Sequence, residues 1–330
     1  MIQVSNLTRY YGALPALRDV SFEVNRGEII GLLGLNGAGK STALKILAGV
    51  LTPSSGSVEM DGRNITENAD DLKATIGFLP EEPPLYRDMT VTSFLTHVGR
   101  LKGMPKADVL ARLPDVIAST GLQGRENQII GTLSHGYKKR VGIAMAVIHS
   151  PSLVILDEPI SGLDPMQIKE MRSVIRRLGK DRAVLISSHI LSEMSKTCDR
   201  LVVLHQGKMV AQGTQEELTK HLSGARVSIT VRNSVDQLTK WLDAHPIVMG
   251  HTTTGSVDGL TSAVVDMNGD KREALVADLI TASFKVRLVE EPEYDLEEVF
   301  LRFTSSRTSS VLDEQDEHTD EVAPTEEINQ

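Results

Sequence analysis

The sequence predicts an α/β protein with a mixed sheet, covering helices and a smaller α+β unit at its end. Short apolar runs at residues 29–33, 153–156, 183–187 and 201–204 alternate with helical stretches, which is typical of a parallel sheet with crossover helices. A glycine-rich loop follows the first of these runs and precedes a helix. The chain of 330 residues is long enough for one large domain and a second small one.

The first 90 residues combine strands and one helix. Partial alternation of apolar residues predicts the first strands, and a turn at residues 26–28 precedes a fully apolar strand. A helix with a 3.6-residue period then stops at Gly49, with Pro53 just beyond. The expected elements are strands at 2–7, 17–24 and 29–33 and a helix at 40–49.

Residues 91–147 have a different texture. Their apolar residues recur at helical spacing with few β-branched runs, and Gly103, Pro105, Gly121 and Gly131 break the pattern. This predicts a helical subdomain inserted into the sheet-bearing domain.

A second domain is expected to follow the first, with the boundary between residues 222 and 223. Its pattern has the order β-α-β-β-α-β, which is compatible with a ferredoxin-like fold. A helix is expected at 296–303, and the acidic stretch 304–330 has too few large apolar residues to fold. The expected elements are strands at 227–231, 247–249, 262–267 and 285–289 and helices at 235–242 and 273–282.

Composition excludes several classes of protein. No run reaches the roughly 18 to 20 apolar residues of a membrane helix, and the first residues lack the apolar core of a secretion signal, so a cytoplasmic location is expected. Cys198 is the one cysteine, which excludes an internal disulfide and a cysteine-rich zinc site.

The net charge of −9 is concentrated at the end of the chain. Residues 311–330 hold eight Asp or Glu and no Lys or Arg, so the other 310 residues carry only −1. A nearly neutral body lacks the basic face of a nucleic-acid binder, and we expect no nucleic-acid partner.

The segment 34–41, GLNGAGKS, fits the phosphate-binding pattern G-x-x-x-x-G-K-[ST] between a predicted strand and helix. Glycines let the backbone N–H groups wrap around phosphate oxygens, and the helix N-terminus adds partial positive charge. Lys40 would reach the β- and γ-phosphates of a nucleotide, and the Ser41 hydroxyl would bind Mg²⁺.

Two carboxylates, Asp157 and Glu158, end the predicted strand 153–156. Ligands of parallel sheets bind at the carboxyl ends of the strands, so both acids would lie beside the phosphate loop. Asp157 suits a Mg²⁺ contact, and Glu158 suits a general base that polarises the attacking water. Alone, the pair would be a solvated strand end before the turn at Pro159.

Three other segments say little by themselves. Ser134 would ordinarily cap a helix, Lys138-Lys139-Arg140 would be a solvated basic face, and His189 would belong to a surface loop.

In combination, these motifs resemble the ATP-binding subunits of ABC transporters over residues 1 to about 220. The phosphate loop, a signature-like LSHGY at 133–137, the Asp157-Glu158 pair, SGLD at 161–164 and His189 occur in the family's order, and Ser134 lies 23 residues before Asp157. The resemblance implies a P-loop NTPase of the ABC cassette fold that binds and hydrolyses ATP with Mg²⁺.

The resemblance also implies roles for individual residues. Tyr11 would stack on adenine, Thr42 would assist Ser41, and His189 would hold the attacking water at the γ-phosphate. Ser134 and Gly136 would cap ATP bound to the partner in a homodimer, while Asp164 would couple the two sites. The predicted cofactor-binding residues are Tyr11, Gly34, Asn36, Gly37, Ala38, Gly39, Lys40, Ser41, Thr42, Ser134, Gly136 and Asp164; the catalytic ones are Glu158 and His189; the metal-binding ones are Ser41, Asp157 and Glu81.

Two positions depart from the family pattern. Glu81 stands where family members usually carry Gln; a carboxylate only accepts hydrogen bonds, yet it is a hard oxygen donor, so Glu81 remains a candidate Mg²⁺ ligand. His135-Gly136-Tyr137 replaces the more usual Gly-Gly-Gln, although Ser134 and Gly136 are kept.

These departures, with LPEEPPLY at 79–86 and LEEVFL at 296–301, resemble the ABC-2 export branch, which includes gliding-motility, drug and copper-related exporters. The expected function is the ATPase subunit of an exporter, held at the inner face of the membrane by a separate integral-membrane permease. The permease would dock near residues 81–100, where Met89, Phe94 and Leu95 could equally pack between helices.

Two alternatives remain at this point. One is a soluble ABC-type ATPase that acts as a switch on DNA or ribosomes, although the chain has a single cassette and no long heptad insertion. The other is a regulatory binding module with residues 224–303 as its sensor. The sequence does not identify a transported substrate.

Overall fold

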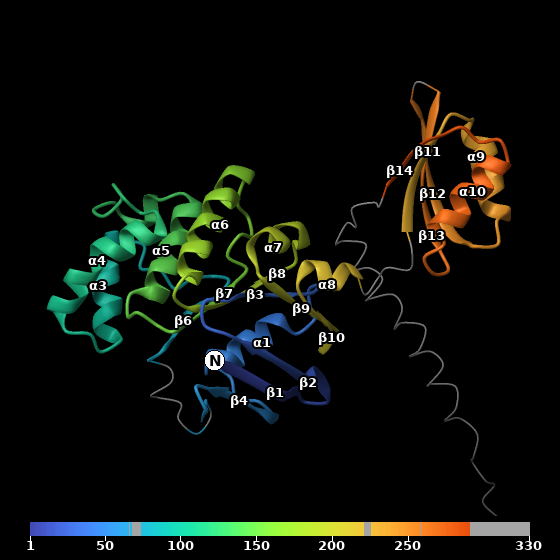
Figure 1. Cartoon of the computed structure of the whole chain (residues 1–330). Helices are drawn as coiled ribbons and strands as arrows, with labels where there is room; N and C mark the ends of the chain where they lie inside the picture. The colour runs from blue at the N-terminus through green and yellow to red at the C-terminus, as the bar shows by residue number, and fades with distance from the viewer. Residues whose placement is uncertain (66, 68–73, 221–225, 258, 291–330) are drawn as a thin grey trace, which may run out of the picture. The chain divides into compact units, whose positions relative to one another are not determined.

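The computed structural model describes residues 1–65, 67, 74–220, 226–257 and 259–290 (Figure 1). These residues form two compact units, which divide between Gln215 and Glu216, whereas the sequence led us to expect the division after residue 222. The helix expected at 296–303 and the acidic tail at 304–330 lie outside the described residues.

The first unit contains two sheets. A six-stranded sheet has the strand order β10-β9-β3-β8-β7-β6; all its neighbours run parallel except the antiparallel pair β9 and β10. A second sheet is antiparallel in the order β2-β1-β4-β5. The strands are β1 Ile2–Tyr11, β2 Leu14–Val24, β3 Ile29–Leu33, β4 Ser55–Met60, β5 Arg63–Asn64, β6 Ile76–Leu79, β7 Leu153–Asp157, β8 Ala183–Ser188, β9 Arg200–His205 and β10 Lys208–Gly213.

Helix α1 (Lys40–Leu47) packs in the core between the two sheets. Its buried Leu44 and Leu47 share one apolar cluster with Val4 of β1 and Leu32 of β3. Helices α6 and α7 cover the opposite face of the large sheet, against β8 and β3 (Figure 1). The central strands β3, β7 and β8 are buried along their whole length, which explains why they read as continuous apolar runs.

Residues 91–147 are helical, as the sequence predicts. Helices α3, α4 and α5 pack on one another to one side of the sheets (Figure 1). The helices of the first unit after α1 are α3 Val91–Leu101, α4 Lys106–Thr120, the 3₁₀ turn η1 Ile130–Thr132, α5 His135–Val147, α6 Pro165–Gly179 and α7 Leu191–Thr197. A short helix, α8 Gln215–Lys220, follows at the start of the second unit.

The second unit has the predicted β-α-β-β-α-β order. Its antiparallel sheet has the strand order β12-β13-β11-β14, so each β-α-β crossover has another strand inserted between its two strands, as in the ferredoxin-like arrangement. The weak strand expected at 247–249 is instead the long strand β12. The elements are β11 Arg226–Val231, α9 Val235–Ala244, β12 Val248–Val257, β13 Leu260–Met267, α10 Arg272–Thr281 and β14 Val286–Glu290.

Candidate nucleotide-binding site

A cavity of about 540 Å³ lies at the carboxyl ends of β3, β6, β7 and β8. Parallel sheets place ligands at this edge, because the loops that leave the strands converge there. The lining residues are Ala16, Asn36, Gly37, Gly39, Lys40, Ser41, Thr42, Glu81, Glu158, Ser161 and His189.

The phosphate loop between β3 and α1 takes the conformation that its glycines allow. Gly37 and Gly39 have positive φ angles of 83° and 102°, and Gly39 is the N-cap of α1. A Cβ on Gly39 would lie 2.5 Å from the carbonyl oxygen of Ala16, so only glycine fits there. The first N–H groups of α1 therefore face the cavity at a helix N-terminus, where anions bind.

Lys40 is buried in this loop. Its Nζ donates to the carbonyl oxygens of Gly34 at 2.7 Å and Leu35 at 3.3 Å, and it lies 3.9 Å from Oε1 of Glu158. Burial lowers the pKa of Lys40, while the carboxylates of Glu158, Asp157 and Glu81 oppose that change. The ammonium group is thus held at the cavity by acceptors that an incoming phosphate could replace.

Asp157 is held by two hydroxyl groups. Oδ1 of its carboxylate accepts hydrogen bonds from Ser187 Oγ at 2.6 Å and from Ser41 Oγ at 3.3 Å. Ser187 Oγ in turn accepts the backbone N–H of Glu158 at 3.0 Å. A hydroxyl and a carboxylate in contact beside a phosphate site fit Mg²⁺, which prefers oxygen donors and usually takes few protein ligands. Within the described residues, no cluster of three His, Cys, Asp or Glu forms an all-protein metal cage.

Glu158 and His189 are in direct contact in the wall of the cavity. Nδ1 of His189 lies 3.1 Å from both carboxylate oxygens of Glu158. Glu158 has a φ angle of +49°, a left-handed conformation that few side-chain-bearing residues adopt, and its side chain is largely buried. His189, which follows β8, thus contacts the Glu158 carboxylate, and Lys40 of α1 approaches the same carboxylate.

The structure brings together most of the residues predicted for this site. Two others, Gly34 and Ala38, belong to the phosphate loop without lining the cavity, and Asp157 lies behind Ser41. Sequence reasoning missed Ala16 and Ser161, which line the cavity, and Ser187, which holds Asp157. Ser187 lies two residues before His189 at the end of an apolar strand, and the sequence pattern gave a role in this segment only to His189.

Four further predicted residues lie apart from the phosphate loop and do not line this cavity. Tyr11 is 49% exposed at the end of β1, with the Arg9 guanidinium 5.2 Å from its ring centre. Asp164 accepts the N–H of Gln167 and so caps α6. Ser134 occupies the N-cap position of α5, but its side chain makes no capping hydrogen bond, and Gly136 is buried against Gln167.

The prediction of a solvated basic face at residues 138–140 is wrong for two of the three residues. Lys139 is 3% exposed and Arg140 8% exposed, and only Lys138 is partly open to solvent. Arg140 pairs with Glu170 of α6 and donates to the carbonyl oxygen of Gly121. The helical period of α5 turns these two cations inward, toward acceptors on other elements.

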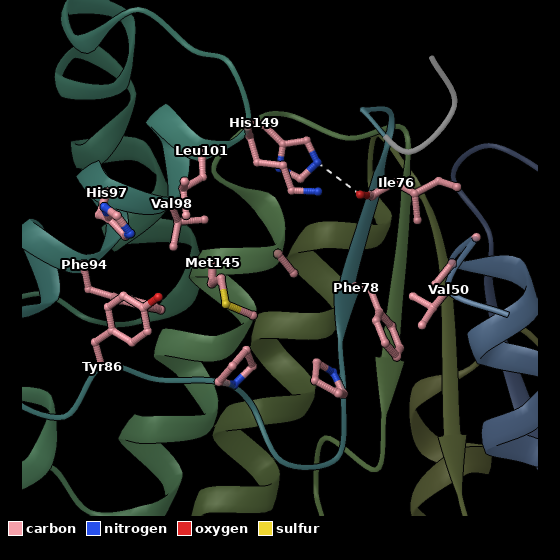
Figure 2. A pocket seen from close by; sticks show the side chains of 16 residues that line it. Val50, Ile76, Phe78, Tyr86, Phe94, His97, Val98, Leu101, Met145 and His149 are labelled. Carbon is pink, nitrogen blue, oxygen red and sulfur yellow. Dashed lines mark hydrogen bonds between the residues drawn. The ribbon is translucent and has the colours of Figure 1, made fainter. Parts of the chain in front are cut away.

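A second, larger cavity of about 760 Å³ is an apolar groove (Figure 2). It carries no phosphate loop and no carboxylate, so we assign the nucleotide to the smaller cavity. The groove is bordered by α3, by α5, by β6 with the loop that follows it, and by the end of α1. Its lining residues are Ala48, Gly49, Val50, Ile76, Phe78, Pro80, Pro84, Tyr86, Phe94, His97, Val98, Leu101, Lys102, Met145, Ala146 and His149.

Near the expected docking region, Leu95 packs between helices, whereas Phe94 also lines the groove. Leu95 is fully buried, and Phe94 is buried while its ring meets that of Tyr86 edge-on at 5.8 Å. At one end of the groove, Nε2 of His149 donates to the Ile76 carbonyl oxygen at 3.1 Å (Figure 2). No helix in the described part of the chain is long and apolar enough to cross a membrane.

Comparison with known proteins gives consistent matches. A family model described as ABC transporter matches residues 17–161. The ABC transporter ATP-binding protein YxlF of Bacillus subtilis (strain 168) is 33% identical over 302 residues, which cover 92% of this chain and 99% of that protein. The bacitracin transport ATP-binding protein BcrA of Bacillus licheniformis is 37% identical over 222 residues, 67% of this chain and 72% of that protein.

A solved structure shows the same architecture. It is described as the ATP-binding subunit of an ABC transporter, superposes with a TM-score of 0.61 at 32% identity, and corresponds to 74% of this chain and 99% of its own.

Proposed function

The chain belongs to the ABC transporter family as an ATP-binding subunit, and from that premise we propose that it hydrolyses ATP to drive a membrane exporter of the ABC-2 type. The observation that carries the hydrolytic part is the contact between Glu158, His189 and Lys40 in the cavity next to the phosphate loop. The reaction is the attack of water on the γ-phosphate of ATP.

Glu158 is the proposed general base. Its carboxylate can accept a proton from water, and its contact with His189 Nδ1 fixes the direction in which the oxygens point. His189 would hold the same water and the γ-phosphate, while Lys40 would leave the carbonyl groups of Gly34 and Leu35 to bind phosphate oxygens. Positioning and charge stabilisation, rather than covalent chemistry, would account for most of the rate.

Ser41 and Asp157 are the proposed holders of Mg²⁺. Ser41 Oγ already contacts Asp157 Oδ1, so both oxygens lie on one side of the phosphate loop. Bound there, the ion would neutralise charge on the β- and γ-phosphates. Glu81 lines the same cavity as Glu158 and stays a candidate third oxygen donor.

Two substitutions test the catalytic assignment. We expect Lys40→Ala to lose MgATP binding, because the ammonium group that pairs with the phosphates is removed. Glu158→Gln should keep ATP affinity within about threefold while turnover falls by roughly 10³-fold, since an amide cannot take up the proton. Calorimetric titration with MgATP and a phosphate-release assay measure the two quantities. Normal turnover by Lys40→Ala would refute the site.

A homodimer is part of the proposal, because the signature residues do not line the cavity of their own chain. The N-terminus of α5 carries exposed Ser134, whose hydroxyl has no capping bond, beside Gly136. An exposed helix N-terminus with a free hydroxyl is suited to bind the phosphates of ATP held by a second copy. Asp164, which begins the neighbouring helix α6, would carry the change between the two sites.

A separate membrane permease is the proposed partner of the groove. Exposed Leu101 and Tyr86, with Val98 and Phe78, offer an apolar surface of the kind that takes the apolar face of a helix (Figure 2). The ABC-2 proposal rests on the LPEEPPLY segment, whose residues Pro80, Pro84 and Tyr86 line this groove. The similarity to the bacitracin transport protein supports the role in transport. The chain would then act at the cytoplasmic face of the membrane.

Recovery of the permease tests this partner. Purification of the tagged chain from detergent-solubilised membranes of its source cells should yield a multi-span protein. Leu101→Asp should lose it, because a charge would be buried in the contact, while MgATP binding stays unchanged. Leu110→Asp, which alters another exposed leucine, on α4 and outside the groove, is the control. Recovery of ribosomes or nucleic acid instead of a permease would contradict the exporter proposal.

A further inference from the structure

Lys139 has a position that a basic residue on a helix surface would not have. It lies in the second turn of α5 with 3% of its surface exposed. Its Nζ donates two hydrogen bonds to main-chain carbonyl oxygens, at 2.6 Å to Glu81 and at 3.3 Å to Glu158. Burying an ammonium group costs free energy unless the group is hydrogen-bonded. The two carbonyl oxygens offset that cost, and neither contact belongs to the phosphate chemistry described above.

The two carbonyl groups belong to the ends of neighbouring strands. β6 and β7 pair in parallel up to Leu79 and Leu156, and Glu81 and Glu158 each stand two residues further along. Both side chains line the nucleotide cavity. Lys139 therefore joins, from outside the sheet, the two chain segments that carry Glu81 and the proposed general base.

Charge favours this bridge. Burial lowers the pKa of Lys139, and the carboxylates of Glu81, Glu158, Asp157 and Glu82 oppose that change. The Lys139 ammonium group thus lies near four acids. Lys40 approaches Glu158 from the other direction, at 3.9 Å, so Glu158 is held between a cation at its carboxylate and another at its carbonyl group.

The segment that Lys139 holds borders both cavities. Glu81 lines the nucleotide cavity, while Pro80, Pro84 and Tyr86 of the same loop line the apolar groove (Figure 2). A segment that fills the groove would contact this loop together with α3 and α5. Through Lys139, the loop is hydrogen-bonded to the backbone of Glu158.

We propose that Lys139 is a positioning residue of the ATPase, which holds the loop at residues 80–86 and Glu158 as one hydrogen-bonded unit. The groove and the general base then move together, so that occupation of the groove sets the position of Glu158 relative to the attacking water. This inference rests on the proposed function and adds to it a route by which the partner regulates hydrolysis.

Lys139→Met is the main test, because methionine keeps the length of the side chain and removes its donors. We expect kcat for MgATP to fall by about 10²-fold, the loss that follows when a reacting group is misplaced by 1 Å. KM and the Kd for MgATP should stay within about threefold, since the phosphate loop does not contact Lys139. Lys138→Met is the matched control and should keep the parent rate, because its side chain is partly exposed and bonds to neither carbonyl.

Two further measurements separate positioning from loss of fold. Lys139→Gln keeps an N–H donor without the charge, and its kcat should lie between those of the parent and Lys139→Met. Hydrogen exchange should rise together at residues 79–88 and 157–163 in Lys139→Met and stay unchanged along α5.

Each outcome decides the matter. Parent-like turnover in Lys139→Met overturns this inference and leaves the proposed function standing. The same holds if turnover and nucleotide affinity fall equally. It also holds if the kcat of Lys139→Gln is no higher than that of Lys139→Met. If the parent protein itself does not turn over MgATP, the proposed function fails and this inference fails with it.

Discussion

Glu158 combines an unusual backbone with an unusual set of neighbours. A left-handed non-glycine residue costs on the order of 1–3 kcal/mol, and such strain tends to occur at functional sites. Here it aims the carboxylate at His189 and Lys40 while the backbone N–H bonds to Ser187 and the carbonyl group to Lys139. Four side chains, from α1, α5, β8 and the loop directly after β8, therefore hold one residue.

The sequence predicted the residue types of this site more completely than their contacts. Lys40 and Ser41 stand at fixed places within the phosphate-loop pattern, and Asp157 and Glu158 are adjacent at the end of an apolar strand. These local patterns are why the four residues were found. Lys139 and Ser187 were missed because their partners lie 19 or more residues away along the chain and are mostly main-chain atoms, which leave no mark on the sequence.

His149 provides a prediction about pH. Burial and the nearby Lys102 ammonium lower its pKa to about 4, and its Nδ1 has no partner among the described residues. In the unfolded chain the pKa is about 6.5, so between pH 6.5 and about 4 the unfolded state binds more protons. The free energy of unfolding should therefore fall as the pH falls through that range. Above it, His149 should not contribute to the pH dependence of stability.

His149→Gln checks this, because glutamine keeps a donor for the Ile76 carbonyl group and does not titrate. Urea unfolding across the same pH range should show a shallower loss of stability in the variant than in the parent. Equal slopes would mean that His149 takes no part.

At the scale of elements, the spacing of apolar residues and the positions of Gly and Pro predicted the secondary structure well. Strands β3, β7, β8 and β9 of the large sheet and helices α1, α9 and α10 begin and end within a few residues of their expected bounds. Strands β4, β5 and β10 were not predicted, since none of them has a continuous apolar run and each gains its order from its neighbours; β5 and β10 lie at sheet edges.

Helix α3 is capped by the residue that precedes it. Thr90 is the N-cap, and its Oγ1 accepts the N–H of Ser93 at 3.2 Å. Thr90→Ala should lower the free energy of unfolding by about 1 kcal/mol, because that N–H loses its acceptor. Thr96→Ala in the middle of the same helix is the control, where alanine has the higher helix propensity and no cap is lost. Urea unfolding measures both, and equal losses would contradict the capping role.

At the scale of the whole molecule, the two units have separate cores. The apolar cluster of the second unit includes Val227, Leu238 and Leu275, and Trp241 packs beside it with its ring centre 5.5 Å from that of Phe284. The chain has one tryptophan, so its fluorescence reports on the second unit alone.

Nucleotide should therefore stabilise the two units unequally. Ligand that binds only the folded first unit adds about 2.7 kcal/mol to its stability at 100 times Kd. Calorimetry with MgATP should show one transition at a higher Tm, while the unfolding transition seen by Trp241 fluorescence stays where it is without nucleotide. A shared shift would show that the units unfold as one.

The loop at residues 80–86 has a consequence for how this enzyme could be blocked. Its groove has a volume of about 760 Å³ and shares no lining residue with the nucleotide cavity, and that size lies within the range of drug-binding pockets. An inhibitor seated against Tyr86 and Phe78 would not compete with ATP. Its potency would not be diluted by the abundant ATP of a living cell, and it would lower the maximal rate while leaving KM unchanged.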